Sequence, residues 1–199
     1  MIDLRTYRFQ DDGVIPNSDL PVLVYPKVCP AEGASTWLEK TFARHGWTNN
    51  WHDVVLTYDH FHSNTHEVLG VGRGSVSLKI GGAGGIMLDL SAGDVIVLPA
   101  GVGHYSVSSQ ADYEMVGGYP LGRAWDMRTG AAEERDEVLA NLAKVDLPET
   151  DPVFGAQGPL LQAWHRMLIT STTAPARAPA AQRAGPAHRP QRGRRLTSR

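Results

Sequence analysis

His60-Phe-His62-Ser-Asn-Thr-His66-Glu67-Val-Leu-Gly-Val-Gly-Arg-Gly74 is the stretch that decides the fold. Successive side chains of a β-strand point to opposite faces, so His60 and His62 present two imidazoles on the same face. A turn over residues 63–65 would bring the chain back beside this strand, where Glu67 adds a carboxylate. A lone histidine is more often structural than a ligand, but this joint pattern favours a metal site.

A second block, Gly93-Asp-Val-Ile-Val-Leu-Pro99-Ala-Gly101-Val-Gly-His104, supplies a third histidine. Its apolar run predicts a strand, and Pro99 with Gly101 predicts a turn before His104 opens the next strand. Three imidazoles and one carboxylate suit iron, manganese, nickel, zinc or copper without selecting among them. The two blocks together predict one divalent metal ion.

Short strand patterns continue outward from these blocks, separated by breaks that contain glycine or proline. The expected strands are residues 21–25, 54–62, 67–71, 75–80, 86–90, 94–98, 104–108 and 113–119. No segment of helix length separates the strands from residue 54 onward, which favours an antiparallel sandwich or barrel. The run Gly81–Gly85 lies between two strands, so we interpret it as a hairpin turn rather than a phosphate-binding loop.

Helical patterns flank the strand region on both sides. Trp37 and Phe42 belong to an apolar face that predicts a helix over residues 34–45, and residues 131–144 predict a second one with an acidic first turn. Residues 152–168 carry enough apolar side chains to pack back on the barrel. The predicted organisation is an N-terminal arm (1–34), a barrel with its preceding helix (35–120), a C-terminal helical segment packing on the barrel (121–170) and a disordered basic tail (171–199).

Charge is distributed unevenly along the 199 residues, although the formal net charge is only −2. Residues 174–199 hold seven arginines and no acid, which leaves 12 Lys and Arg against 21 Asp and Glu in the rest of the chain. An acidic body argues against nucleic-acid binding, which needs clustered cations. Cys29 is the single cysteine, and no stretch is apolar over the roughly 18 residues that a membrane span needs. We therefore expect a cytoplasmic protein without a disulfide or a membrane contact.

The two blocks resemble the paired motifs of the cupin superfamily, His-x-His-x4-Glu-x6-Gly and Gly-x5-Pro-x-Gly-x2-His. Over about residues 37–164 the pattern is similar to a bacterial group, the YjlB-like single-domain cupins of unassigned function. The resemblance implies an all-β fold: a double-stranded β-helix, the RmlC-like jelly-roll barrel, with a short N-terminal helix and C-terminal helical segments. The sequence departs from the motifs at Val54, where a glycine is common, and at Ser108, where an asparagine is common.

Carried over residue by residue, the resemblance assigns the metal ligands to His60, His62, Glu67 and His104. It implies one divalent ion, Fe, Mn, Ni or Zn, in the mouth of the barrel. His66 is adjacent to Glu67 and so points to the opposite face, which excludes it from the ligand set. Strand phase places Tyr58 on the face of His60 and Ser106 on that of His104, and we predict both as substrate contacts. No catalytic residue is identified.

Three functions are compatible with this site. The favoured hypothesis is a dioxygenase-like oxidoreductase acting on a small organic molecule, because four protein ligands leave two positions open on a six-coordinate metal. The alternative enzyme is a sugar-type isomerase, in which Tyr58 or Glu114 would be the base. The third hypothesis is a non-enzymatic cupin that binds a small molecule. Under each of them the partner is a small-molecule ligand, and a homodimer is among the assemblies considered.

Overall fold

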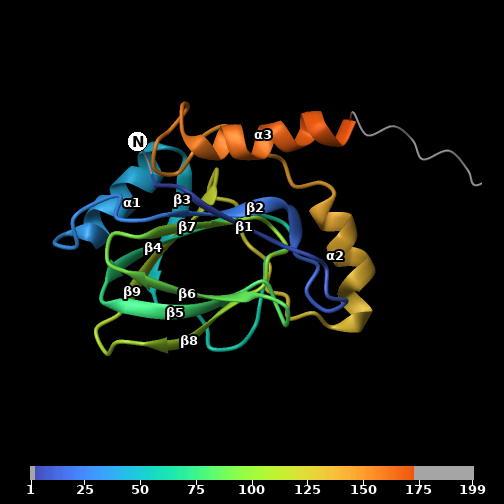
Figure 1. The fold of residues 1–199 in the computed structure, drawn as a ribbon, viewed down its shortest axis with the longest axis horizontal. Helices are drawn as coiled ribbons and strands as arrows, with labels where there is room; N and C mark the ends of the chain where they lie inside the picture. The colour runs from blue at the N-terminus through green and yellow to red at the C-terminus, as the bar shows by residue number, and fades with distance from the viewer. Residues whose placement is uncertain (1–2, 173–199) are drawn as a thin grey trace, which may run out of the picture.

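The computed structural model describes residues 3–172, with side chains through residue 165. From residue 173 onward the predicted basic tail therefore lies outside the described residues. Within them, antiparallel strands form a six-stranded sheet in the order β1-β2-β7-β4-β9-β3 and a three-stranded sheet in the order β6-β5-β8. Figure 1 shows the smaller sheet facing the larger one, with α1 and α3 outside the larger sheet and α2 beside the end of the two sheets. This arrangement confirms the predicted all-β class.

The strands are β1 (Arg5–Phe9), β2 (Ser18–Tyr25), β3 (Trp47–Asp53), β4 (Glu67–Arg73), β5 (Ser75–Ile80), β6 (Ile86–Ser91), β7 (Val95–Leu98), β8 (His104–Ser109) and β9 (Glu114–Pro120). The helices are α1 (Ala34–Arg44), the 3-10 turn η1 (Ala132–Glu134), α2 (Arg135–Leu142) and α3 (Pro159–Thr172). None of the helices among the described residues is long and apolar enough to cross a membrane.

The central strands of the larger sheet are buried on both faces. In β2, Val22 and Val24 join a core between the two sheets, whereas Leu23 and Tyr25 join a second core beneath α1 and α3. The same alternation runs through β7, where Ile96 faces inward and its two valine neighbours face outward. A strand covered on both faces needs a continuous apolar run, which explains the composition of β2 and β7.

Residues 151–164 pack on the outer face of the larger sheet. Asp151 is fully buried and accepts hydrogen bonds from the Tyr25 hydroxyl (2.8 Å) and the Leu160 backbone N–H (3.1 Å). Trp164 is also fully buried, and its indole N–H donates to the Pro21 carbonyl at 2.9 Å. These bonds fix the start and the middle of α3 against β2.

One predicted strand was wrong, and strands β1 and β3 were not predicted. Residues 54–62 do not form a regular strand: only His60 and Phe61 make isolated bridges, and the strand of this region is β3, directly before them. The arm predicted over residues 1–34 supplies β1 and β2, both of which pair within the larger sheet. Strand β3 has a polar composition because it is an edge strand, and such a strand lacks the apolar alternation on which the sequence reading depended.

Candidate metal centre

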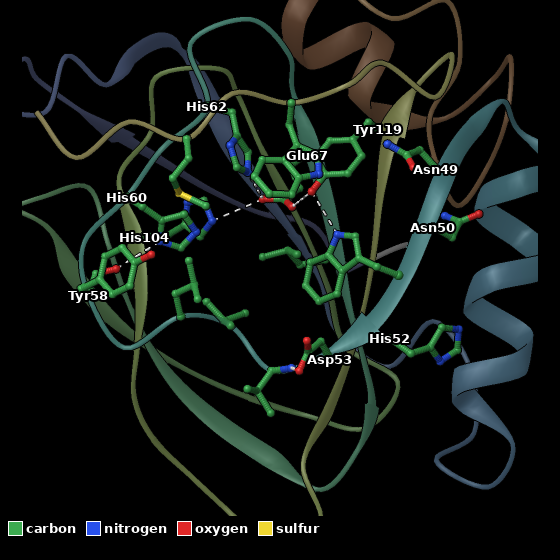
Figure 2. A pocket seen from close by; sticks show the side chains of 17 residues that line it. Asn49, Asn50, His52, Asp53, Tyr58, His60, His62, Glu67, His104 and Tyr119 are labelled. Carbon is green, nitrogen blue, oxygen red and sulfur yellow. Dashed lines mark hydrogen bonds and ion pairs between the residues drawn. The ribbon is translucent and has the colours of Figure 1, made fainter. Parts of the chain in front are cut away.

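The three motif histidines converge at one end of the barrel (Figure 2). His60 and His104 lie side by side because their backbones pair: the His104 N–H donates to the His60 carbonyl at 2.9 Å. His62 follows two residues later and is tied to the turn before β8 by a 2.8 Å bond from the Gly101 N–H to its carbonyl. All three imidazoles are buried, and each offers a ring nitrogen within 4.8 Å of those of the other two.

The ring orientations leave a lone pair on each histidine for a metal. Each Nδ1 lies within hydrogen-bond distance of a backbone carbonyl, and because a carbonyl oxygen only accepts, Nδ1 must carry the proton. A neutral imidazole protonated at Nδ1 presents Nε2 as an unprotonated ligand atom. The acceptors are the carbonyl oxygens of Tyr58, Asp126 and Val102, at 3.1, 2.5 and 3.1 Å from His60, His62 and His104 respectively.

Glu67, the first residue of β4, brings its carboxylate to the same place. Its Oε2 atom lies 3.4 Å from Nε2 of His62 and 3.3 Å from Nε2 of His104. Its Oε1 atom accepts a 2.8 Å hydrogen bond from the Tyr119 hydroxyl, whereas Oε2 is buried without a hydrogen-bond donor. A buried carboxylate oxygen that faces two imidazole nitrogens and lacks a donor is suited to coordinate a cation.

The pKa shifts within the cluster agree with a cation-binding site. Burial, followed by the neighbouring His104, lowers the pKa of His60 to about 3, so this ring is neutral at physiological pH. Burial alone would also lower the pKa of His62, but the Glu67 carboxylate outweighs it and raises the pKa. The same pair holds the pKa of Glu67 below its ordinary value despite burial, so the carboxylate stays ionised. The three buried histidines could thus bind a divalent cation, with one negative charge beside them.

A segment after β9, residues 124–128, braces the loop that carries His62. The Asp126 carboxylate accepts from the Ser63 backbone N–H at 2.7 Å and from the Ser63 hydroxyl at 2.5 Å. Arg128 holds the same carboxylate at 2.9 Å, and its backbone pairs with that of Phe61. The Asp126 carbonyl that orients His62 is therefore fixed by both its own side chain and its neighbours, an arrangement typical of supported metal ligands.

A cavity of about 460 Å³ opens from the four side chains to the surface. Tyr58 lines it and is half exposed, with its ring 5.9 Å from that of His60. Ser106 is buried in β8 and is not among the residues that line the cavity. His66 directly precedes β4 and does not line the cavity; its ring lies 4.6 Å from that of Trp164 in α3.

The sequence reading missed the aromatic wall of the cavity, which consists of Trp51, Tyr119 and Trp125. Tyr119 had a usable signal, because it shares strand phase with the inward-facing Met115. Trp51 had none. Between the pairs Thr48↔Tyr119 and Trp51↔Gly117, strand β3 contains one extra residue, a bulge that reverses its phase and turns Trp51 toward the cavity.

No family model matches this sequence. The protein YjlB of Bacillus subtilis, described as uncharacterized, is 42% identical over 163 residues, which cover 81% of this chain and 97% of YjlB. Solved structures with a similar fold include an acireductone dioxygenase from Bacillus anthracis with a cadmium ion in its active centre, at 16% identity and a TM-score of 0.34. That match covers 61% of this chain and 80% of the dioxygenase.

Two further solved structures are similar to this chain. A TDP-quinovose 3,4-ketoisomerase from Campylobacter jejuni is 13% identical with a TM-score of 0.38, over 47% of this chain and 75% of the isomerase. A variant of oxalate decarboxylase from Bacillus subtilis is 17% identical with a TM-score of 0.35, over 69% of this chain and 36% of the decarboxylase. The extent and identity of the match to YjlB, together with both cupin motifs on a two-sheet barrel, establish that the chain belongs to the YjlB family of cupins.

Proposed function

We propose that this protein binds one divalent metal through His60, His62, Glu67 and His104 and acts as a metal-dependent, dioxygenase-like oxidoreductase on a small organic molecule. The observation that carries the proposal is the convergence of three free Nε2 atoms and one donorless carboxylate oxygen at the bottom of an open cavity. A redox-active metal held there would supply the means to join dioxygen to an organic substrate.

The chain's own residues would bind, orient and shield the substrate. The cavity volume of about 460 Å³ is sufficient for a small molecule, and more than half of its lining residues are apolar or aromatic, which would exclude bulk water from the reacting atoms. Tyr119 keeps its proton because burial and the Glu67 carboxylate both raise the pKa of its hydroxyl. It can therefore hold Glu67 in one orientation throughout a reaction cycle.

The isomerase alternative requires a base in the cavity, and of the two candidate bases, Tyr58 and Glu114, only Tyr58 lines it. Glu114 is not among the lining residues: its carboxylate accepts from the Ser35 hydroxyl and pairs with Arg73 at 2.9 Å. Tyr58 does line the cavity, and it remains the candidate base for that reaction. A non-enzymatic binding protein would use the same metal and cavity without turnover, so activity has to be tested directly.

Oxygen consumption separates these three functions. The metal-depleted protein is reconstituted without oxygen with Fe(II), Mn(II), Ni(II) or Zn(II), then mixed with phenols, diketones, thiols and hydroxy acids. An oxygenase takes up oxygen with the redox-active ions and not with zinc, which has no redox chemistry, and transfers both atoms of labelled dioxygen to the product. The matched control is iron-treated His104→Ala, in which the cluster lacks one imidazole. Ligand-induced stabilisation that is equal with zinc and iron, without oxygen uptake, would favour the isomerase or the binding protein.

A further inference from the structure

The composition of the cavity wall restricts what the cavity can bind. Four aromatic side chains, those of Trp51, Tyr58, Tyr119 and Trp125, line the cavity beside five aliphatic or thioether side chains, and none of the described lining residues is lysine or arginine. The aliphatic and thioether side chains are those of Val54, Val55, Leu56, Leu69 and Met127. Cavities of this composition bind the apolar part of a ligand by burial and leave its polar part to a few specific groups.

The ionisable side chains of His52 and Asp53 at the rim contact other groups of the chain. His52 points away from the cavity toward α1 in Figure 2, where it lies 3.4 Å from Glu39 and 3.5 Å from Glu114. The Asp53 carboxylate accepts from the backbone N–H of Val54 at 2.8 Å. Neither residue offers a cation to a ligand in the cavity. A diphosphate or a dicarboxylate would therefore bury negative charge without a basic partner among the described residues.

The charge at the bottom of the cavity favours a ligand with a single negative charge. A divalent ion held by three neutral imidazoles and the Glu67 carboxylate keeps one net positive charge. A monoanion with two adjacent oxygen atoms neutralises that charge and fills two coordination positions at once, whereas a dianion leaves an excess buried charge.

The mouth of the cavity presents large apolar side chains to solvent. Trp125 is 43% exposed and Met127 is 37% exposed. The Trp125 ring lies 5.3 Å from the His62 ring and 6.3 Å from the Tyr119 ring, so it forms one wall directly beside the candidate ligands. A flat ring bound against this wall would remove apolar surface of both partners from water and gain ring contacts.

We infer that the ligand of this cavity is a small planar aromatic molecule whose head is a monoanionic pair of oxygen donors, as in a catechol or an aryl enediol. Nucleotide-linked sugars and dicarboxylates are excluded from this class. The inference rests on the proposed function, because the two oxygen donors of the ligand require the metal. The aromatic wall of the cavity then favours ligands that carry an aromatic ring.

Two hydroxamates that share one metal-binding head test the class without any turnover. Benzohydroxamate carries a phenyl ring where acetohydroxamate carries a methyl group, and both are titrated calorimetrically into the zinc-loaded full chain. Benzohydroxamate should bind at least about tenfold more tightly, since ring burial and ring contacts exceed about 1.4 kcal/mol. Uridine diphosphate, the polyanionic probe, should bind more weakly than benzohydroxamate.

Variants assign the preference to the wall. Trp125→Ala should reduce the preference to about threefold or less, because benzohydroxamate loses its ring contact and acetohydroxamate has none to lose. Trp37→Ala is the matched control, because Trp37 is 38% exposed and is not among the lining residues. Met127→Ala should also reduce the preference. The same effect from two different substitutions would show that it comes from loss of the wall and not from a local distortion caused by one of them.

The outcomes distinguish the inference from the function on which it rests. Equal affinity for the two hydroxamates, or tighter binding of uridine diphosphate, overturns the ligand class and leaves the metal site standing. If neither hydroxamate binds a chain that contains one zinc ion, the metal has no coordination positions open to a ligand. That result would overturn the proposed function together with the ligand class.

Discussion

Replacing Tyr119 by Phe removes one hydroxyl that connects the candidate ligand Glu67 to the cavity wall. The hydroxyl donates to Glu67 Oε1 at 2.8 Å and accepts from the Trp51 indole N–H at 3.0 Å, and the residue is almost fully buried. Phenylalanine fills the same space, so the fold should persist. The carboxylate oxygen and the indole N–H would each lose this partner.

The size of the effect follows from those two contacts. A hydrogen bond to a charged group contributes about 1.5–3 kcal/mol, and the loss of a residue that supports a metal ligand typically costs about 10- to 100-fold in metal affinity. The Tyr119→Phe variant should therefore bind zinc about 10- to 100-fold more weakly, which corresponds to about 1.4–2.7 kcal/mol. Competition of the metal-depleted protein with a chromogenic chelator measures this affinity.

Tyr113→Phe is the control for this experiment. Tyr113 is buried and immediately precedes the same strand, but its hydroxyl makes no hydrogen bond to Glu67 or to the three histidines in the described structure. Its substitution should leave zinc affinity within about twofold of the parent chain. Unchanged affinity in Tyr119→Phe, or an equal loss in both variants, would refute the role assigned to the Tyr119 hydroxyl.

Three further predictions concern stability and the cavity wall. Asp151→Ala should lower the free energy of unfolding by roughly 3 kcal/mol in urea titrations, because several buried donors lose their common acceptor; wild-type stability would contradict that role. The Ser35 hydroxyl, with further help from Arg73, holds the pKa of Glu114 below its ordinary 4.5. A carboxyl group whose pKa is lower in the folded than in the unfolded protein stabilises the fold at pH values above its unfolded-state pKa, and this stabilisation is lost as the pH falls. Glu114→Gln should therefore lower the free energy of unfolding by up to about 1 kcal/mol at pH 7 and by little near pH 3. Equal losses at both pH values would be inconsistent with this linkage. Gly117→Ala would place a Cβ directly against the Trp51 ring, so the ring should move. A shift of tryptophan emission would report this movement, and an unchanged spectrum would count against the tight packing.

His60, His62 and Glu67 could be predicted as a cluster because their geometry is local, whereas His104 was assigned through the resemblance to the second cupin motif. His60 and His62 need only an extended backbone to share a face, and Glu67 follows after one turn. The pairing of His60 with His104 then supplies the third imidazole. The extended segment itself was placed too broadly, since residues 54–59 form no strand and only the two bridges at its end are regular.

The cavity wall could not be predicted because it depends on distant contacts. Trp51 enters the cavity only because a bulge in β3 reverses the strand phase, and Asn49 at the bulge adopts a positive φ of 56°. Trp125 lies on an irregular segment whose position depends on Asp126 and Arg128. No periodicity in the sequence records either arrangement.

The measurement that tests the central claim most directly is the metal content of the full chain after metal removal and reconstitution, determined by elemental analysis. The account predicts about one divalent ion per chain in the parent protein and in His165→Ala, whose histidine is exposed on α3. It predicts loss of that ion in the double variant His60→Ala/His104→Ala, which keeps only one imidazole and the Glu67 carboxylate. One retained ion per chain in the folded double variant would contradict the assignment of the metal site.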